Sequence, residues 1–295
     1  MLNRVCLRTG FNSRWSIASR SKKTHFGFLT VEEEEKQHRV HDVFRNVATK
    51  YDLMNDVMSC GLHRLWKDTF VRELRPKPEM RILDCAGGTG DIALRISAES
   101  RRISVSQPCE VIVTDINQAM LNVGKEKAKE RQVTGLSWLR ANAEELPFQD
   151  NTFDAYTIAF GIRNCTHIER VLDEALRVLV PGGRFMCLEF SQIQSQLLSR
   201  PYDWYSFNVI PVLGRLIAND WNSYRYLVES IRTFPDQQAF AKLMRQSGFE
   251  SVAWTNLLCG IVAIHSGYKL STGTVQSRHR KSEAKFNNRA QPKEK

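Results

Sequence analysis

A glycine-rich loop between an apolar run and a helical pattern is the feature that most restricts the fold of this 295-residue chain. It reads ILDCAGGTGD from Ile82 to Asp91. The run at Arg81–Cys85 predicts a buried strand, and the apolar positions after Gly90 recur at helical spacing. Glycines in such a turn let the backbone bend tightly and let a ligand approach it closely. The loop therefore predicts a ligand-binding turn in a fold of alternating strands and helices.

The alternation continues along the chain. Further strands are predicted at Glu110–Asp115, Leu136–Leu139, Phe153–Phe160, Arg184–Phe190 (after the turn at 181–183), Val252–Asn256 and Ile261–His265. Helices are predicted at Glu32–Tyr51, Leu62–Leu74, 91–96, Asn117–Arg131, Ile168–Leu179 and Pro235–Gln246. This order predicts an α/β fold with a doubly wound, mostly parallel seven-stranded sheet, helices on both faces and an antiparallel hairpin at its end.

The second predicted strand ends in Asp115, and a carboxylate at that point accepts hydrogen bonds from both hydroxyls of a ribose. The loop departs from the dinucleotide pattern GxGxxG, because Asp91 falls where a pyrophosphate would lie. A carboxylate at a helix N-terminus repels phosphate. S-adenosyl-L-methionine has no phosphate and carries two cationic groups, so a loop lined by Asp84 and Asp91 favours it. We expect Asp115 and the loop glycines to bind this cofactor: Gly87, Gly88 and Gly90.

The net charge of +10 lies at the two ends of the chain. Residues 1–31 carry +6 and residues 271–295 carry +5, which leaves −1 for residues 32–270. The folded region is therefore nearly neutral, and a basic groove for nucleic acid is not supported. The arginine-rich, acid-free start is typical of a mitochondrial transit peptide. We expect a transit peptide or disordered segment at 1–31, the folded domain at 32–270, and a basic disordered tail at 271–295.

Two further motifs resemble those of the ubiquinone/menaquinone biosynthesis C-methyltransferases. The first is YDLMNDVMSCGLHRLW, from Tyr51 to Trp66, and the second is RVLVPGGRFMCLEFS, from Arg177 to Ser191. The second departs from the family at Val180, where lysine is usual. The similarity extends from about Val40 to Leu270. It implies the Rossmann-like fold of class I S-adenosylmethionine-dependent methyltransferases, with a helical substrate cap at about 196–231.

The resemblance also implies individual cofactor contacts. By position, these fall on Thr89, Asp115, Asn142 and Ala143. A further family contact, often serine, falls on Ala159, so a contact there must come from the backbone. The residues alone allow a similar reading of Asn142, whose side chain follows the third strand and can meet an adenine edge.

The implied reaction is C-methylation of a polyprenyl benzoquinol in ubiquinone biosynthesis, which needs no metal ion. Arg163, Asn164 and Tyr51 are the catalytic candidates. Arg163 is not itself a base, since its pKa exceeds about 12, so we expect it to stabilise a phenolate or to position a water molecule. His63 has two possible roles: a catalytic base, or a structural residue that packs or caps a helix. The aromatic-rich cap has two compatible readings, a buried cover and the lining of a channel for the polyprenyl tail.

The implied location is the matrix side of the mitochondrial inner membrane, as a peripheral protein in a complex with other ubiquinone-biosynthesis proteins. Three alternatives stay open: a methyltransferase for RNA or DNA, one for another small molecule, and a cofactor-binding assembly subunit. The loop Gly161-Ile162-Arg163-Asn164 lacks the Asn-Pro-Pro-aromatic turn common in base-amine methyltransferases, which weakens the first. The sequence leaves the oligomeric state open, a homodimer included.

Overall fold

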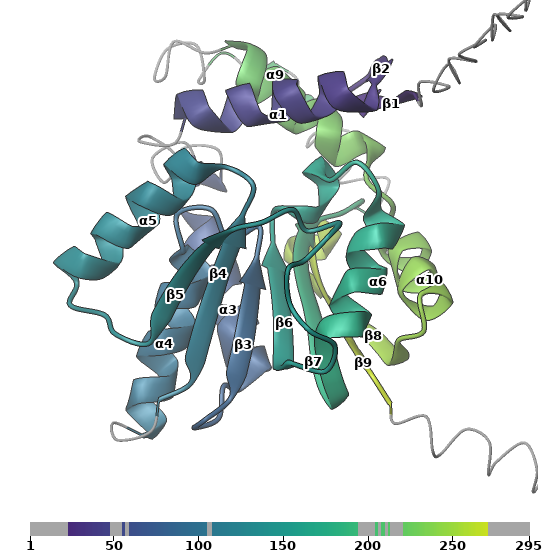
Figure 1. Ribbon diagram of the computed structural model, residues 1–295. Coiled ribbons are helices and arrows are strands. Elements are labelled where there is room, and N and C mark those ends of the chain that lie inside the picture. Colours follow the sequence, from purple (N-terminus) through teal and green to yellow (C-terminus); the bar gives the residue numbers. More distant parts are fainter. Residues whose placement is uncertain are drawn as a thin grey trace, which may run out of the picture.

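A seven-stranded sheet forms the centre of the protein (Figure 1). The computed structural model describes residues 23–47, 55–56, 59–104, 108–193, 204–205, 208–209, 212 and 221–270. In the order of the sheet, the strands are β5 (Leu136–Arg140), β4 (Glu110–Asp115), β3 (Arg81–Cys85), β6 (Phe153–Ala159), β7 (Leu179–Phe190), β9 (Val262–Tyr268) and β8 (Glu250–Leu257). The first five are parallel, and β9 is antiparallel to both of its neighbours. The predicted fold class is confirmed.

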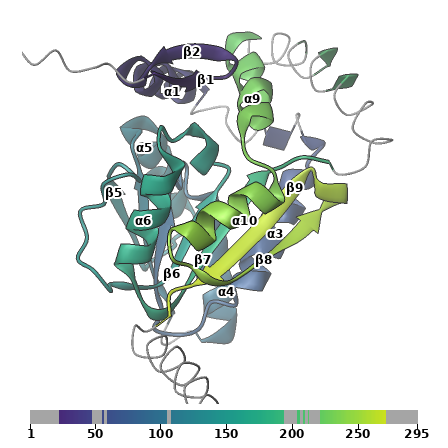
Figure 2. The same ribbon diagram turned by 90° about the vertical axis from the view of Figure 1, so that its right-hand side faces the viewer.

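Helices cover both faces of this sheet and bury two apolar cores against it (Figure 2). Apart from two helices described below, the helices are α3 (Leu62–Leu74), α4 (Asp91–Ile103), α5 (Gln118–Glu130), the short helix η2 (Ile162–Asn164), α6 (Ile168–Val178), α10 (Gln237–Gln246) and the short helix η3 (Leu258–Gly260). Side-chain caps start two of them, because Asn117 accepts amide hydrogens at α5 and Asp236 does so at α10. No helix within these described ranges is long and apolar enough to cross a bilayer.

The chain reverses its direction of winding at β3. From β3 it proceeds outward through β4 to β5, and then returns to place β6 on the other side of β3. The loops after β3 and β6 therefore leave the carboxyl edge of the sheet in opposite directions. A crevice at such a switch point is the usual ligand site of an open parallel sheet.

An N-terminal hairpin and two helices lie over this carboxyl edge (Figures 1 and 2). They are β1 (Lys23–Phe26), β2 (Leu29–Glu32), α1 (Glu33–Val47) and α9 (Trp221–Thr233). The ring of Phe26 stacks on that of Tyr226 with centroids 4.1 Å apart, and the amide of Phe28 donates to Glu229 Oε2 at 3.1 Å. Residues 23–31 therefore belong to an ordered hairpin, although the sequence placed them in a transit peptide or disordered segment at 1–31. Short strands held by a distant helix leave no periodic signal.

Other boundaries differ in smaller ways. Strand β7 begins at Leu179, so the predicted turn at 181–183 lies inside it, where its pairing with β6 shifts in register between Phe153 and Ala155. Helix α1 ends at Val47 in the described part, and residues 48–51 of its predicted range lie outside the described residues. Most of the predicted cap at 196–231 lies outside them too, and its described end is α9. The two terminal segments, 1–22 and 271–295, are also outside, so the transit peptide and the tail stay predictions.

Candidate active site

The loop between β3 and α4 folds as a tight turn at the carboxyl edge. Ala86, Gly88 and Gly90 have φ values of 50°, 55° and 75°, which glycine adopts most readily. A side chain at Gly87 would place its Cβ 2.7 Å from Val113 Cγ1 and 2.9 Å from Asp84 Oδ2. The loop therefore depends on glycine both for its backbone angles and for the room behind it.

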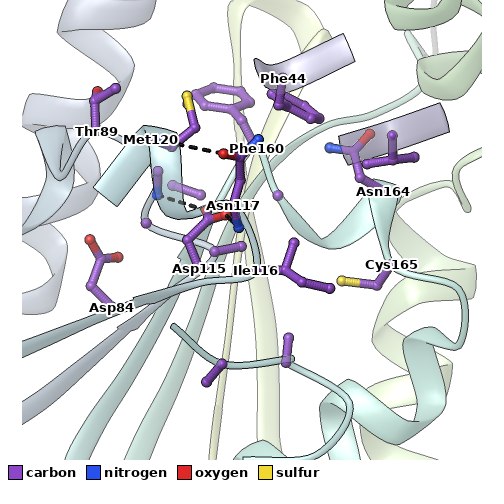
Figure 3. A pocket seen from close by; sticks show the side chains of 18 of the residues that line it. Phe44, Asp84, Thr89, Asp115, Ile116, Asn117, Met120, Phe160, Asn164 and Cys165 are labelled. Carbon is purple, nitrogen blue, oxygen red and sulfur yellow. Dashed lines mark hydrogen bonds between the residues drawn. The ribbon is translucent and has the colours of Figure 1, made fainter. Parts of the chain in front are cut away.

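This loop forms one wall of a pocket that contains most of the predicted cofactor residues (Figure 3). The predicted residues that line it are Gly87, Gly88, Thr89, Asp115, Asn142, Ala143, Ala159 and Asn164. Gly90 is not among the lining residues. It starts α4, and a side chain there would collide with the indole of Trp138. Gly90 therefore has a packing role as well, and its contact with the cofactor stays a prediction.

Asp115 is held rigidly at the tip of β4. Its Oδ2 accepts the amide hydrogen of Gly88 at 2.9 Å, and its Oδ1 accepts that of Asn117 at 2.8 Å. Burial raises the pKa of this carboxyl to about 6, against the lowering effect of these two hydrogen bonds. Each oxygen keeps a second lone pair, so Asp115 can still accept two hydroxyl hydrogens from a ligand.

Asp84 lies deeper in the same pocket and is completely buried. Its Oδ1 accepts the hydroxyl hydrogen of Thr157 at 2.9 Å, whereas Oδ2 has no hydrogen-bond partner within the described residues. Burial raises the pKa of Asp84 to about 7, and the charges of Asp91 and Asp115 add to this effect. A buried carboxylate with a free oxygen fits a cationic ligand, which is the chemistry expected of S-adenosyl-L-methionine.

Asp91 differs from the other two carboxylates. Its oxygens bind the ammonium of Lys67 at 2.8 Å and the guanidinium of Arg95 at 3.1 Å. Burial would raise its pKa, but these two cations outweigh burial and lower the pKa of Asp91 to about 2. The protein itself therefore neutralises Asp91, although this side chain lines the pocket as predicted, and its role toward the ligand stays a prediction. Lys67 was not among the predicted site residues, and its only signal in the sequence is its place directly after the Tyr51–Trp66 motif.

Helix α1 closes the pocket opposite the sheet. Three of its residues line the pocket: Val40, His41 and Phe44. Two hydrogen bonds hold this helix in place, from Lys36 Nζ to the carbonyl of Cys165 at 2.8 Å and from Asn117 Nδ2 to the carbonyl of His41 at 3.3 Å. Asn142 lines another wall of the pocket, and its Oδ1 accepts the amide hydrogen of Glu144 at 3.0 Å and so stabilises the turn. Its side-chain NH2 group is left to meet a ligand.

A second, more apolar pocket adjoins the first, and the two share Phe44, Lys67 and Phe160. Its other lining residues are Asn55, Ser59, Cys60, Leu62, His63, Trp66, Arg163, Phe190, Tyr205, Leu227, Ile231, Leu258 and Ile261. Tyr205, Leu227 and Ile231 (the last two on α9) belong to the cap region or its immediate end. For its described residues, the interpretation of the cap as the wall of a pocket is therefore supported.

Arg163 and Asn164, which are consecutive in η2, line different pockets. Arg163 lines the second pocket, and its Nη1 donates to Glu189 Oε1 and to the carbonyl of Phe160, both at 2.7 Å. Its Nε is buried and has no hydrogen-bond partner within the described ranges. Asn164 lines the first pocket and accepts the hydroxyl hydrogen of Tyr226 at 3.0 Å. Tyr51, the third catalytic candidate, lies outside the described residues.

Glu189 neutralises Arg163 inside the protein. Its side chain is 1% exposed and that of Arg163 is 4% exposed. Burial raises the pKa of Glu189 above its ordinary value, although the guanidinium lowers it in part. The arrangement fixes the Arg163 guanidinium while leaving Nε for a ligand. No cluster of His, Cys, Asp and Glu suited to a metal ion occurs among the residues that the structure describes.

Comparison of the sequence with known proteins gives a family match over nearly the whole folded region. The model of the ubiE/COQ5 methyltransferase family matches residues 31–269. A Danio rerio protein named 2-methoxy-6-polyprenyl-1,4-benzoquinol methylase, mitochondrial, is 51% identical and covers 90% of this chain and 91% of its own. Proteins of the same name from Drosophila melanogaster and Homo sapiens are 54% and 49% identical. The alignments cover 86% and 90% of this chain, and 88% and 94% of theirs.

Solved structures show the fold at low sequence identity. A Thermotoga maritima S-adenosylmethionine-dependent methyltransferase, described as a possible histamine N-methyltransferase, has a TM-score of 0.54 at 20% identity. The match covers 78% of this chain and 99% of that one. An Aquifex aeolicus S-adenosylmethionine-dependent methyltransferase has a TM-score of 0.50 at 16% identity, over 69% and 89% of the two chains. At this identity the likeness concerns the fold alone.

Proposed function

The chain belongs to the ubiE/COQ5 methyltransferase family, and we propose that it C-methylates 2-methoxy-6-polyprenyl-1,4-benzoquinol in ubiquinone biosynthesis. The relatives that match most of its length carry this activity in their names. The observation that carries the proposal for this chain is the pair of adjoining pockets, one polar and one apolar, with Phe44, Lys67 and Phe160 between them.

The cofactor is S-adenosyl-L-methionine, which supplies a methyl group on a cationic sulfonium. Asp115 would accept the ribose hydroxyls, and Asn142 with Ala143 would meet the adenine. The unpartnered oxygen of Asp84 favours the cationic end of the cofactor. The glycine loop would bring backbone amides and Thr89 close to it, and residues of α1 would cover it on the side opposite the sheet.

The apolar pocket suits a ring with a hydrocarbon tail. Its walls include the aromatic side chains of Trp66, Phe160 and Phe190, and it reaches the cap residues Leu227 and Ile231. Apolar walls with a few polar groups are typical of sites for hydrophobic small molecules. A polyprenyl quinol would place its ring beside the wall shared with the cofactor pocket, because the methyl must pass between the two.

Arg163 would stabilise the oxyanion that makes the ring nucleophilic. Ionising a phenol hydroxyl sends electron density onto ring carbons, and Arg163 Nε is a buried donor with a vacant hydrogen bond beside the apolar pocket. Asn164, bonded to Tyr226, would hold the loop against the cofactor. Alignment of the ring carbon with the methyl is worth about 7–11 kcal/mol of the barrier.

The proposed location is the matrix side of the mitochondrial inner membrane, where the protein would be peripheral and would associate with other ubiquinone-biosynthesis proteins. Its relatives are named mitochondrial, and the first 31 residues contain six basic residues and no acid. A hydrophobic substrate supports work at a membrane surface.

A labelled-methyl assay tests the proposal against its alternatives. Protein is incubated with methyl-labelled S-adenosyl-L-methionine and either a short-chain methoxy-polyprenyl hydroquinone or bulk RNA, and the products are identified. We expect label on a ring carbon of the quinol and none in RNA. Label in RNA would favour a nucleic-acid methyltransferase. Cofactor binding without transfer to either would favour an assembly subunit or a methyltransferase for another small molecule.

A further inference from the structure

The imidazole of His63 lies in the wall of the apolar pocket with one nitrogen bonded and the other free. His63 is the second residue of α3 and is 6% exposed. Its Nε2 lies 2.8 Å from Asp56 Oδ1. Its Nδ1 is buried and has no hydrogen-bond partner among the residues that the structure describes. The ring therefore has one unused polar atom.

The partners of Asp56 decide which nitrogen carries the proton. Arg64 donates Nε to Oδ1 at 2.8 Å and Nη2 to Oδ2 at 2.6 Å. Hydrogen bonds from Arg64 and then from His63 hold the pKa of Asp56 well below its ordinary value, so it is a carboxylate. A carboxylate only accepts hydrogen bonds, so Nε2 of His63 is the donor. Burial and then the charge of Lys67 lower the pKa of His63, outweighing Asp56, and the neutral ring carries its lone pair on Nδ1.

A purely structural role leaves Nδ1 unexplained. The turn before α3 is already held by Ser59, whose Oγ accepts the amide hydrogen of His63 at 3.1 Å and donates to the carbonyl of Asn55 at 2.7 Å. A buried acceptor with no donor costs about 1–3 kcal/mol. A packing or capping side chain would serve without that second nitrogen, whereas a ligand hydroxyl would satisfy it.

Arg163 lines the same pocket, and its buried Nε is a complementary donor with no hydrogen-bond partner among the described residues. Two residues that line the pocket thus supply one unused acceptor and one unused donor. This set matches a hydroquinone, which has hydroxyl groups on an aromatic ring and needs to lose one proton. It also matches the dyad arrangement in which a carboxylate fixes the tautomer of a catalytic imidazole.

We propose that His63 is the general base of the reaction and that Asp56 is its positioning residue. The inference rests on the proposed function, because it requires a phenolic substrate. Nδ1 takes the phenol proton, and the electron pair of the broken O–H bond shifts into the ring. The ring carbon then bonds to the methyl group of the cofactor, while the electron pair of the broken C–S bond stays on sulfur. The methylated carbon then loses its hydrogen to water, and the imidazolium returns its proton to the oxygen. One proton is released per turnover.

The main test is His63→Gln, whose amide can still donate to Asp56 but which has no basic nitrogen. General-base catalysis contributes about 10²–10⁴-fold, so we expect kcat with the short-chain quinol to fall at least about 100-fold. The calorimetric affinity for S-adenosyl-L-methionine and the melting temperature should stay close to wild type. His38→Gln, an exposed histidine on α1, is the matched control and should leave kcat unchanged.

Two readouts separate a base from a structural residue. Quinols with electron-withdrawing substituents ionise more readily, so they should recover much of the lost rate in His63→Gln. A chain-bearing nitrophenol bound in the pocket should show less phenolate absorbance in His63→Gln than in wild type, with no methyl transfer involved. Asp56→Asn should lower kcat at least tenfold, whereas Asp173→Asn, on the exposed side of α6, should not.

The pH profile of kcat/KM is the last test of the proposal. In wild type it should fall on the acidic side of the ordinary histidine pKa of about 6.5, because burial and Lys67 lower the pKa at which the imidazole becomes protonated. The charged groups around the ring are Asp56 with Arg64, Lys67 with Asp91, and Arg163 with Glu189. His63→Gln should lose this acidic limb. If Glu189→Gln loses it instead, or if His63→Gln keeps near wild-type kcat, the proposal is wrong. Absence of quinol methylation in wild type would refute the proposed function itself.

Discussion

Replacing Asp115 with asparagine should weaken the binding of S-adenosyl-L-methionine by about 30- to 150-fold. The carboxylate already accepts one amide hydrogen on each oxygen, from Gly88 and from Asn117. A hydrogen bond to a charged acceptor is worth about 1.5–3 kcal/mol and one to a neutral acceptor about 0.5–1.5 kcal/mol. Weakening two ribose hydrogen bonds in this way removes about 2–3 kcal/mol of binding free energy.

The same change should leave the empty protein folded. Burial raises the pKa of Asp115 from 3.8 to about 6, so its folded form holds a proton more tightly than its unfolded form. At pH 7.5 the ionised carboxylate of Asp115 therefore lowers the free energy of unfolding by about 3 kcal/mol. This penalty disappears as the pH falls from about 6 toward 3.8, because the carboxyl becomes protonated in the folded protein. Asparagine removes this penalty, but its NH2 group faces one of the two backbone amides. Because both groups are donors, one hydrogen bond is lost, which lowers the free energy of unfolding by about 1–3 kcal/mol. The two effects offset each other.

Calorimetric titration at pH 7.5 and pH 5.5, with thermal melts of the empty proteins, tests this reasoning. Wild-type affinity should fall at the lower pH because the carboxylate becomes protonated, and Asp115→Asn should lose this part of the dependence. Asp84 titrates in both proteins, so the difference between them is diagnostic. Asp150→Asn, at an exposed position, is the matched control. An affinity of Asp115→Asn within threefold of wild type at pH 7.5 would refute the assignment.

Three further changes have predicted outcomes. Arg163→Ala should lower turnover about 100-fold, as loss of one oxyanion donor does, with much less effect on cofactor affinity by calorimetry; wild-type turnover would remove Arg163 from the mechanism. Gly87→Ala forces a contact with Val113 and Asp84, so unfolding in urea should show a loss of about 1–3 kcal/mol; an unchanged midpoint would contradict this. Burial lowers the pKa of His265 to about 4, so its neutral form should contribute about 3 kcal/mol that is lost as pH falls from about 6.5 to 4. His265→Gln should flatten the wild-type curve there, and parallel curves would count against it.

The strands and helices that the sequence predicted accurately are those whose burial follows from local pattern. Arg81–Cys85, Glu110–Asp115 and Leu62–Leu74 were predicted with the bounds that the structure has. Strands covered on both faces are apolar along their length, and each ends where polar residues reach the carboxyl edge. For the same reason Asp115 could be assigned to the cofactor site from its place at a strand end.

The parts that the sequence did not predict depend on contacts between distant residues. The hairpin at Lys23–Glu32 is held by Tyr226 and Glu229 of α9, some two hundred positions away. The pairing of Lys67 with Asp91 joins two helices, and no spacing rule connects them. The free nitrogen of His63 depends on Asp56 and on burial together, which explains why the sequence alone left this residue with two readings.

Three carboxylates meet around the cofactor pocket, and their different partners explain its preference for a cation. Lys67 and Arg95 neutralise Asp91, which fixes the start of α4 and leaves no charge there for the ligand. Among the described residues, Asp84 and Asp115 form no ion pair with a lysine or arginine, and their pKa values are raised because burial opposes their charge. A sulfonium or ammonium relieves this penalty, whereas a phosphate would increase it. Both acids of the predicted loop line the pocket, and Asp84 is the one that the protein does not already neutralise with a lysine or arginine among the described residues. Burial and then the charge of Lys67, which lies in the wall shared by the two pockets, lower the pKa of His63, and this favours the unprotonated form that the proposed base requires.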